Sequence, residues 1–167
     1  LYETPFSRFQ LHQVKIESNI INDWLWYDES ENVNVLVQHG DHFLIMSQTK
    51  YAIPGPSLAV IGGLIEPGET PLQAAQREVR EELGYQASNW KSLGQFVAAA
   101  NRGGGTTHIF WATDAKPLRE SRDGEVALGE LEKQHLIRLT KSELLEALLQ
   151  GKFREIKWTA TVALALL

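Results

Sequence analysis

One stretch of sequence, GGLIEPGETPLQAAQREVREELGY at Gly62–Tyr85, constrains the fold of this chain more than any other. Thr70 is a good N-cap, a proline follows at the first helical position, and Gln73 completes a capping-box pattern. Gly84 is a typical C-cap residue. The residues between them are mostly strong helix formers. These signals predict a helix over Pro71–Leu83, directly after a glycine-rich turn.

Three glutamates, Glu78, Glu81 and Glu82, lie close together on this predicted helix. At about 100° per residue they share an arc of roughly 100°. Like charges at these spacings cost a few tenths of a kcal/mol per pair, and a divalent cation would remove that cost. Magnesium prefers carboxylate oxygens and keeps waters that it shares with substrate phosphates. The cluster is therefore either a metal site or a solvated charged face.

The rest of the helix surface divides into two kinds of position. Arg77 and Arg80 alternate with the glutamates in sequence, where they can form local ion pairs, but they lie off the glutamate arc. A neighbouring arc is apolar and predicts the stripe that faces the core. The residues of this predicted stripe are Leu72, Ala75, Val79 and Leu83.

Composition narrows the class of protein. The 167 residues suit one domain, and the net charge of −5 provides no basic field for a nucleic-acid backbone. The absence of cysteine excludes disulfides, thiolate metal sites and a cysteine nucleophile, and it fits a reducing compartment. The first twenty residues show no signal peptide, and the apolar tail TATVALALL is too short to span a bilayer. We expect a cytoplasmic protein without a nucleic-acid or membrane partner.

Strand-like patterns surround the predicted helix. An extended arm leads into the strands HQVKIES and IINDWLWYDE, and a hairpin follows in which the valines Val33, Val35 and Val37 alternate along the strand. IPGPS predicts a loop, and LAVIGG predicts a short buried strand. After the helix, two strands flank a predicted loop NRGGG, and QHLIRL is the last strand. The segments TKSELLEALLQG and WTATVALALL are predicted to be helices.

The fixed positions of this stretch match a known signature. The chain resembles the Nudix hydrolase superfamily, whose box reads G-x5-E-x7-R-E-U-x-E-E-x-G-U, with U a bulky apolar residue. Tyr85 is aromatic where the family more often has an aliphatic residue. The matching residues are Gly63, Glu69, Arg77, Glu78, Val79, Glu81, Glu82, Gly84 and Tyr85.

The resemblance implies an α/β fold, a Nudix-type α/β/α sandwich around a mixed sheet with an N-terminal strand arm. We expect residues 1–32 to form the arm and part of a homodimer interface, and residues 33–167 to form the Nudix hydrolase domain. The implied reaction is metal-dependent hydrolysis of a nucleoside diphosphate linked to another moiety. The implied cofactor is Mg²⁺, with Mn²⁺ as an alternative.

The matching positions also imply roles. The implied metal ligands are Glu78, Glu81, Glu82 and the main-chain carbonyl of Gly62. The residues implied to support the box are Gly63, Glu69, Arg77 and Gly84. In the ADP-ribose pyrophosphatase branch the general base is a glutamate on the loop before the final strand, and register favours Glu130 or Glu132. Alternatively, Glu81 is itself the base.

Features outside the box resemble the ADP-ribose pyrophosphatase and nucleotide-sugar hydrolase branch, with two departures. Gln48 is followed by Lys50 where the branch has arginine, and Asn101 replaces a proline. Lys50 either reaches a substrate phosphate or is an edge-strand lysine. Arg102 either binds a phosphate or lies at a hairpin tip. Trp26 either stacks a base across a dimer or packs the arm against a dimer partner or the sheet.

Two further functions stay open at this point. Some Nudix modules sense a nucleotide without turnover, but such modules usually lose box carboxylates, and this chain keeps them. A nucleoside triphosphate pyrophosphohydrolase would differ in substrate only. A panel of nucleotides assayed with magnesium distinguishes these possibilities.

Overall fold

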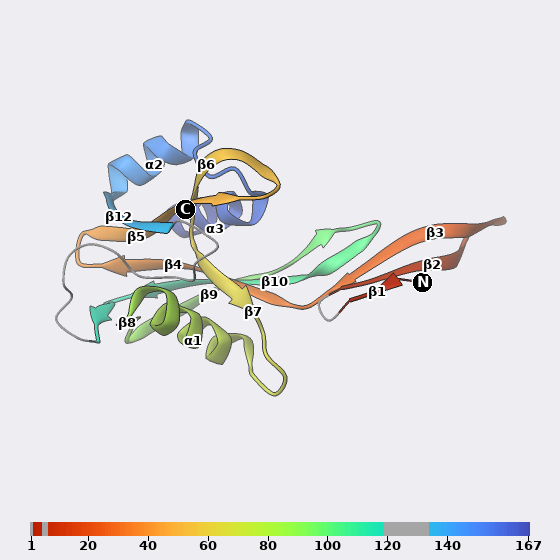
Figure 1. Cartoon of the computed structure of the whole chain (residues 1–167), viewed down its shortest axis with the longest axis horizontal. Helices are drawn as coiled ribbons and strands as arrows, with labels where there is room; N and C mark the ends of the chain where they lie inside the picture. The colour runs from red at the N-terminus through yellow and green to blue at the C-terminus, as the bar shows by residue number, and fades with distance from the viewer. Residues whose placement is uncertain (1, 5–6, 119–133) are drawn as a thin grey trace.

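A mixed, curled β-sheet forms the centre of the fold in the computed structural model, which describes residues 2–4, 7–118 and 134–167 (Figure 1). The described strands are β1 (Tyr2–Glu3), β2 (Ser7–Ile16), β3 (Asn19–Glu29), β4 (Asn32–His39), β5 (His42–Lys50), β6 (Ile53–Ala59), β7 (Ile61–Leu64), β8 (Tyr85–Gln86), β9 (Asn89–Ala99), β10 (Gly103–Thr113), β11 (Lys116–Pro117) and β12 (Gln134–Thr140). The described helices are α1 (Pro71–Leu83), α2 (Lys141–Leu149) and α3 (Ile156–Leu166).

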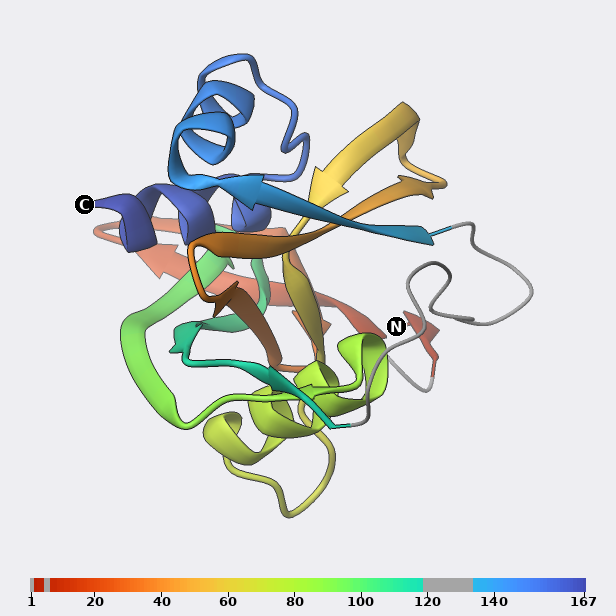
Figure 2. The ribbon, with the colours of Figure 1, turned by 90° about the vertical axis from the view of Figure 1, so that its left-hand side faces the viewer.

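The main sheet follows the order β1-β2-β3-β10-β4-β5-β12, with β6, β7 and β9 paired to β5, β4 and β10. Strand β10 runs parallel to both β3 and β4, whereas the other pairs in this sheet are antiparallel. Helix α1 lies on one side of the strands, and α2 and α3 lie on the other (Figure 2). The expected α/β/α sandwich around a mixed sheet is confirmed.

Helix α1 begins and ends where the sequence predicts. The Thr70 hydroxyl accepts a hydrogen bond from the backbone N–H of Gln73, and the Gln73 side chain accepts one from the backbone N–H of Thr70. Gly84 ends the helix in the left-handed conformation, with φ of 67°. Because capping contacts fix both ends of α1, the residues near those ends determine where the helix begins and therefore where the three glutamates lie on it.

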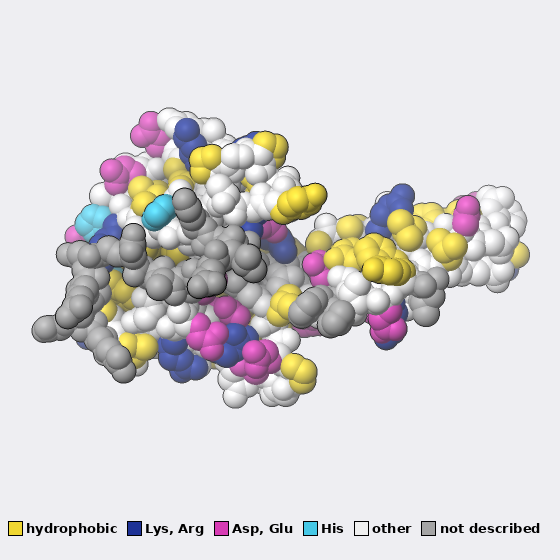
Figure 3. Space-filling model, viewed as in Figure 1, with side chains coloured by type: hydrophobic (Ala, Val, Ile, Leu, Met, Phe, Trp, Pro, Cys, Tyr) yellow, Lys and Arg dark blue, Asp and Glu magenta, His cyan; other side chains and the backbone are white. Residues whose placement is uncertain are grey.

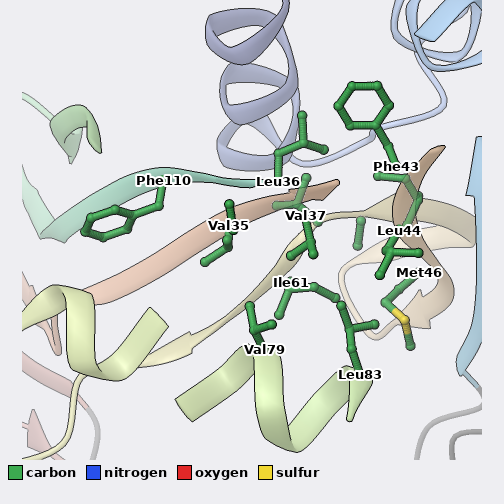
Figure 4. Packing of buried hydrophobic residues seen from close by; sticks show 14 of the residues in the cluster. Val35, Leu36, Val37, Phe43, Leu44, Met46, Ile61, Val79, Leu83 and Phe110 are labelled. Atoms are coloured by element: carbon green, nitrogen blue, oxygen red, sulfur yellow. The ribbon is translucent and has the colours of Figure 1, made fainter. Parts of the chain in front are cut away.

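The core stripe of α1 differs at one position from the prediction. Ala75, Val79 and Leu83 are buried, but Leu72 is 39% exposed and Ala74 is buried in its place. Leu72 lies in the first turn of the helix. Figure 4 shows Val79 and Leu83 pointing toward Ile61.

The alternation predicted for Val33, Val35 and Val37 is incomplete, because every residue from 32 to 37 is buried. Helices α1 and α3 pack on opposite faces of β4, so neither face meets water. Leu36 therefore lies in the core and points toward the side of the sheet opposite α1 (Figure 4).

Two predicted loops are strands. The segment IPGPS lies within β6, an edge strand that pairs with β5 and tolerates proline for that reason. Gly103–Gly105 of the predicted NRGGG loop belong to β10, and all three have positive φ. A Cβ at Gly103 would lie 2.4 Å from the Tyr27 carbonyl oxygen, so close contact with β3 requires glycine there.

An N-terminal arm, built from β2 and β3, extends away from the helices (Figure 1). It joins the body through the Tyr27 N–H, which donates to the Arg102 carbonyl at 2.8 Å. Apolar side chains lie exposed along it, including Leu11 at 65% and Ile20 at 58% (Figure 3). Within the described residues, no helix is both long and apolar enough to cross a bilayer.

Candidate active site

Two glycines of β7 make close contacts, Gly63 with α1 and Gly62 with β4. A Cβ at Gly63 would lie 2.1 Å from the Glu78 Oε1 atom, and a Cβ at Gly62 would lie 2.3 Å from the Val33 carbonyl oxygen. Real Cβ atoms do not reach such distances, so Gly62 is needed against the backbone of β4, and a side chain at Gly63 would displace the Glu78 carboxylate. Strand and helix therefore meet at the Glu78 carboxylate, whose side chain is 12% exposed.

Arg77 is the hub of the polar contacts around this carboxylate. Its guanidinium donates to both Glu69 carboxylate oxygens at 3.0 and 3.1 Å and to the Leu64 carbonyl at 2.9 Å. It also donates to Glu78 at 2.6 Å and to Glu81 at 3.1 Å. Arg77 lies off the glutamate arc by its helical position, but its long side chain reaches across to two glutamates of the arc.

These contacts have opposite effects on two carboxyl groups. Burial raises the pKa of Glu78, and Arg77 partly offsets this effect. The hydrogen bond from Arg77 lowers the pKa of Glu69, which lies at the surface. The same hydrogen bond to Glu69 raises the pKa of Arg77. The loop that carries Glu69 is therefore held to α1 by a charged, bidentate contact.

The three glutamates of the arc lie at different depths. Glu78 is buried against β7, and the Glu81 side chain is 59% exposed. Glu82 accepts a hydrogen bond from the Gly62 N–H at 3.3 Å. The carboxylate and carbonyl oxygens here have the donor chemistry of a hard cation such as Mg²⁺ or Mn²⁺. No cluster of three acidic or histidine side chains within ligand distance of one point forms among the described residues.

A pocket of about 200 Å³ opens beside the box. The box contributes Gly62, Gly63 and Glu82 to its wall. Strand β5 contributes Met46, Gln48 and Lys50, which share one face because alternate strand residues point the same way. The remaining lining residues are Glu29, Asn32, Val33, Asn34, Val60, Leu64, Gln134, Glu155, Lys157 and Trp158.

The structure brings only one predicted substrate residue, Lys50, into this pocket. Trp26 lies in the arm, where its ring stacks on His12 with centroids 5.4 Å apart. Arg102 lies at the turn before β10 and lines a separate hollow with Trp24. The predicted bases Glu130 and Glu132 lie outside the described residues.

Several pocket residues were missed from the sequence. Asn32 and Asn34 are buried on β4, at positions that are strand-like and carry no motif. Glu155, Lys157 and Trp158 come from the start of α3, which the sequence presents as an apolar helix at the end of the chain. No local signal links α3 to the box, because tertiary packing alone brings them together.

Comparisons with known proteins agree with this geometry. The family profile described as NUDIX domain matches residues 29–160. ADP compounds hydrolase NudE of Escherichia coli (strain K12) is 31% identical over 85 residues, which cover 51% of this chain and 45% of that protein. A structure titled "Crystal structure of ADP compounds hydrolase" superposes with a TM-score of 0.70 and 20% identity, covering 99% of this chain and 95% of the other.

Glu69→Gln tests the contact between loop and helix. The folded pKa of Glu69 lies below its ordinary value near 4.5. Its contribution to stability is therefore present above that value and is lost as pH falls through the lowered folded pKa. We expect wild type to have the higher Tm at pH 7 and the difference to vanish in acid, as measured by thermal unfolding in EDTA.

Glu66→Gln is the matched control, because Glu66 lies in the same loop and its side chain is exposed. Its Tm should follow that of wild type at each pH. A Glu69→Gln difference that stays constant from pH 7 into acid would contradict an ionic contact.

Proposed function

This chain belongs to the Nudix family, and we propose that it is a metal-dependent pyrophosphohydrolase acting on a nucleoside diphosphate linked to a sugar. One observation carries the proposal: the pocket beside the box is lined by both Glu82 and Lys50. A carboxylate that can hold a cation and an ammonium group that can bind a phosphate therefore face one space. A pyrophosphate with its cation needs both kinds of group.

The residues divide the chemistry as follows. Glu78, Glu81, Glu82 and the Gly62 carbonyl would hold the divalent cation, which neutralises pyrophosphate oxygens and lowers the pKa of a water. Lys50 donates to a phosphate oxygen as a point charge rather than as a bidentate fork. A carboxylate outside this set accepts the proton of the attacking water. Arg77 positions the carboxylates of Glu78 and Glu81 through its hydrogen bonds to them.

The substrate class is inferred from the relatives and from the residues that line the pocket. The relatives are described as hydrolases of ADP compounds, but the matched sequence spans less than half of the curated one. We propose ADP-ribose or a nucleotide sugar, since polar residues outside the box also line the pocket. A cytoplasmic location, expected from the lack of cysteine, stays a prediction.

The arm is the basis of a second proposal, that two copies of the chain form a homodimer. We propose that residues 1–32 provide the interface and residues 33–167 the hydrolase domain. The exposed side chains of Leu11 and Ile20 support this, because exposed apolar strands need a partner. In such a dimer Trp26 of the arm and Arg102 of the turn before β10 would contact the substrate.

Assays of wild type on a nucleotide panel with Mg²⁺ test the function directly. We expect AMP to be released from ADP-ribose and from nucleotide sugars at higher kcat/KM than from nucleoside triphosphates. Preference for triphosphates would reassign the substrate. Tight nucleotide binding without turnover on the panel would instead favour a sensing module.

Glu82→Gln tests the box. We expect turnover to fall by more than the roughly 10–100-fold typical of losing an outer-shell partner of a metal, with the Tm nearly unchanged. Glu146→Gln on α2 is the control, since Glu146 is exposed and outside the pocket. Unchanged turnover in Glu82→Gln would reject Glu82 as a ligand.

Glu130→Gln and Glu132→Gln test the base. The variant that lacks the base should lose on the order of 10²–10⁴-fold in kcat, with metal affinity retained in a Mn²⁺ titration. Glu125→Gln, in the same acidic segment, is the control. If both variants keep wild-type kcat, the role passes to Glu81.

Leu11→Lys tests the dimer by sedimentation. We expect wild type to sediment as a dimer and Leu11→Lys as a monomer, because a buried lysine would lack a partner. Leu149→Lys is the matched control, since Leu149 is 79% exposed on α2, outside the arm. A monomeric wild type at micromolar concentration would reject the proposed interface.

A further inference from the structure

One pocket residue carries a polar group that the box does not explain. Gln48 is only 7% exposed and lines the pocket between Met46 and Lys50 on β5. Its backbone belongs to the sheet, paired with Ser57 and Gln134. Its side-chain amide makes no hydrogen bond to any residue in the described ranges 2–4, 7–118 and 134–167. The residue as a whole is nine-tenths buried, yet its amide atoms are not among the fully buried polar atoms that lack a partner, so they face the open space of the pocket, where a ligand can pair with them.

The neighbouring buried amides differ from Gln48. Asn34 donates to the Asn32 side-chain oxygen at 3.3 Å, and the Thr107 hydroxyl donates to the same oxygen at 2.9 Å. These three side chains bond to one another, and the bond from Thr107 to Asn32 links β10 to β4. Gln48 lies outside that network, so its amide is available to a molecule in the pocket.

The start of α3 lines the same pocket. The Lys157 ammonium group lies 3.1 Å from the Glu155 carboxylate, and both side chains are about 30% exposed, at 29% and 30%. Trp158 is 7% exposed and also lines the pocket. The wall thus combines an amide, a carboxylate, an ammonium group and an aromatic ring.

This combination selects among the parts of the substrate. A phosphate placed here would meet the Glu155 carboxylate, and an apolar group would leave the Gln48 amide unpaired. A hydroxyl group both donates and accepts, so it can bond to the amide, the carboxylate and the ammonium group in turn. The ring of Trp158 offers an apolar surface of the kind that packs against a sugar's C–H groups.

We propose that Gln48, Glu155 and Lys157 form a subsite for the hydroxyl groups of the sugar on the distal phosphate. The subsite rests on the proposed function, because the pyrophosphate at Lys50 and Glu82 brings the sugar to this wall. Gln48 then sets the preference for a sugar-linked diphosphate over one with a small alkyl group in its place.

Gln48→Met is the sharpest test, because methionine has similar length and volume but no strong hydrogen-bonding group. The probes are ADP-ribose and the methyl ester of ADP, which lacks the second sugar. Two readouts are needed: KM and kcat with Mg²⁺, and equilibrium binding by calorimetry in EDTA, where no turnover occurs. We expect the preference for ADP-ribose over the methyl ester to fall about tenfold, as the loss of one or two hydrogen bonds predicts.

Thermal unfolding separates this role from a structural one. Removing an unpartnered buried amide should leave the Tm unchanged or raise it, whereas removing a structural amide should lower it. Gln86→Met on β8 is the matched control, since Gln86 is exposed and outside the pocket. Its preference between the two probes should equal that of wild type.

Glu155→Gln is the second variant and should also reduce the preference for ADP-ribose. Equal losses on both probes in Gln48→Met would overturn the sugar subsite and leave the proposed hydrolase intact. A wild type that favours ADP-ribose in neither assay would overturn it too. A wild type that binds ADP-ribose selectively but hydrolyses neither probe would reject the hydrolase and keep the subsite.

Discussion

The close approach of α1 to β7 is the constraint on which the rest of the site depends. Because Gly63 has no side chain, the Glu78 carboxylate lies directly against the strand. A buried carboxylate needs a compensating charge, and Arg77 supplies it. Arg77 in turn ties down Glu69, so the loop before the helix is held by the same residue. The box is one connected electrostatic unit.

The sequence predicted the helix of this unit well because its signals are local. Capping by Thr70 and Gly84 involves residues within a few positions of the helix ends, and those predictions are confirmed. The prediction was wrong or incomplete where distance along the chain or side-chain length matters. Arg77 reaches across the arc, which positions on a helical projection do not reveal. The segment IPGPS is an edge strand because β5 lies beside it.

The pocket was less predictable than the box. Lys50 follows a family pattern, but Glu155 and Lys157 reach the pocket only because α3 packs on β4 and β10. The burial of Gln48 likewise depends on the neighbouring strand β6 and on β12, which is distant in sequence. The proposed metal ligands thus lie in a short local motif, whereas the other residues that line the pocket are brought together by the fold. Motif matches therefore identify reaction chemistry better than substrate.

The glycines at the start of β10 separate two parts of the molecule mechanically. Gly103 allows β10 to lie against Tyr27 of the arm, while the same strand pairs with β4 beneath the box. Glu78 and Glu82 lie on another element, α1. A substitution at Gly103 would therefore disturb the attachment of the arm while leaving the residues of the box in place.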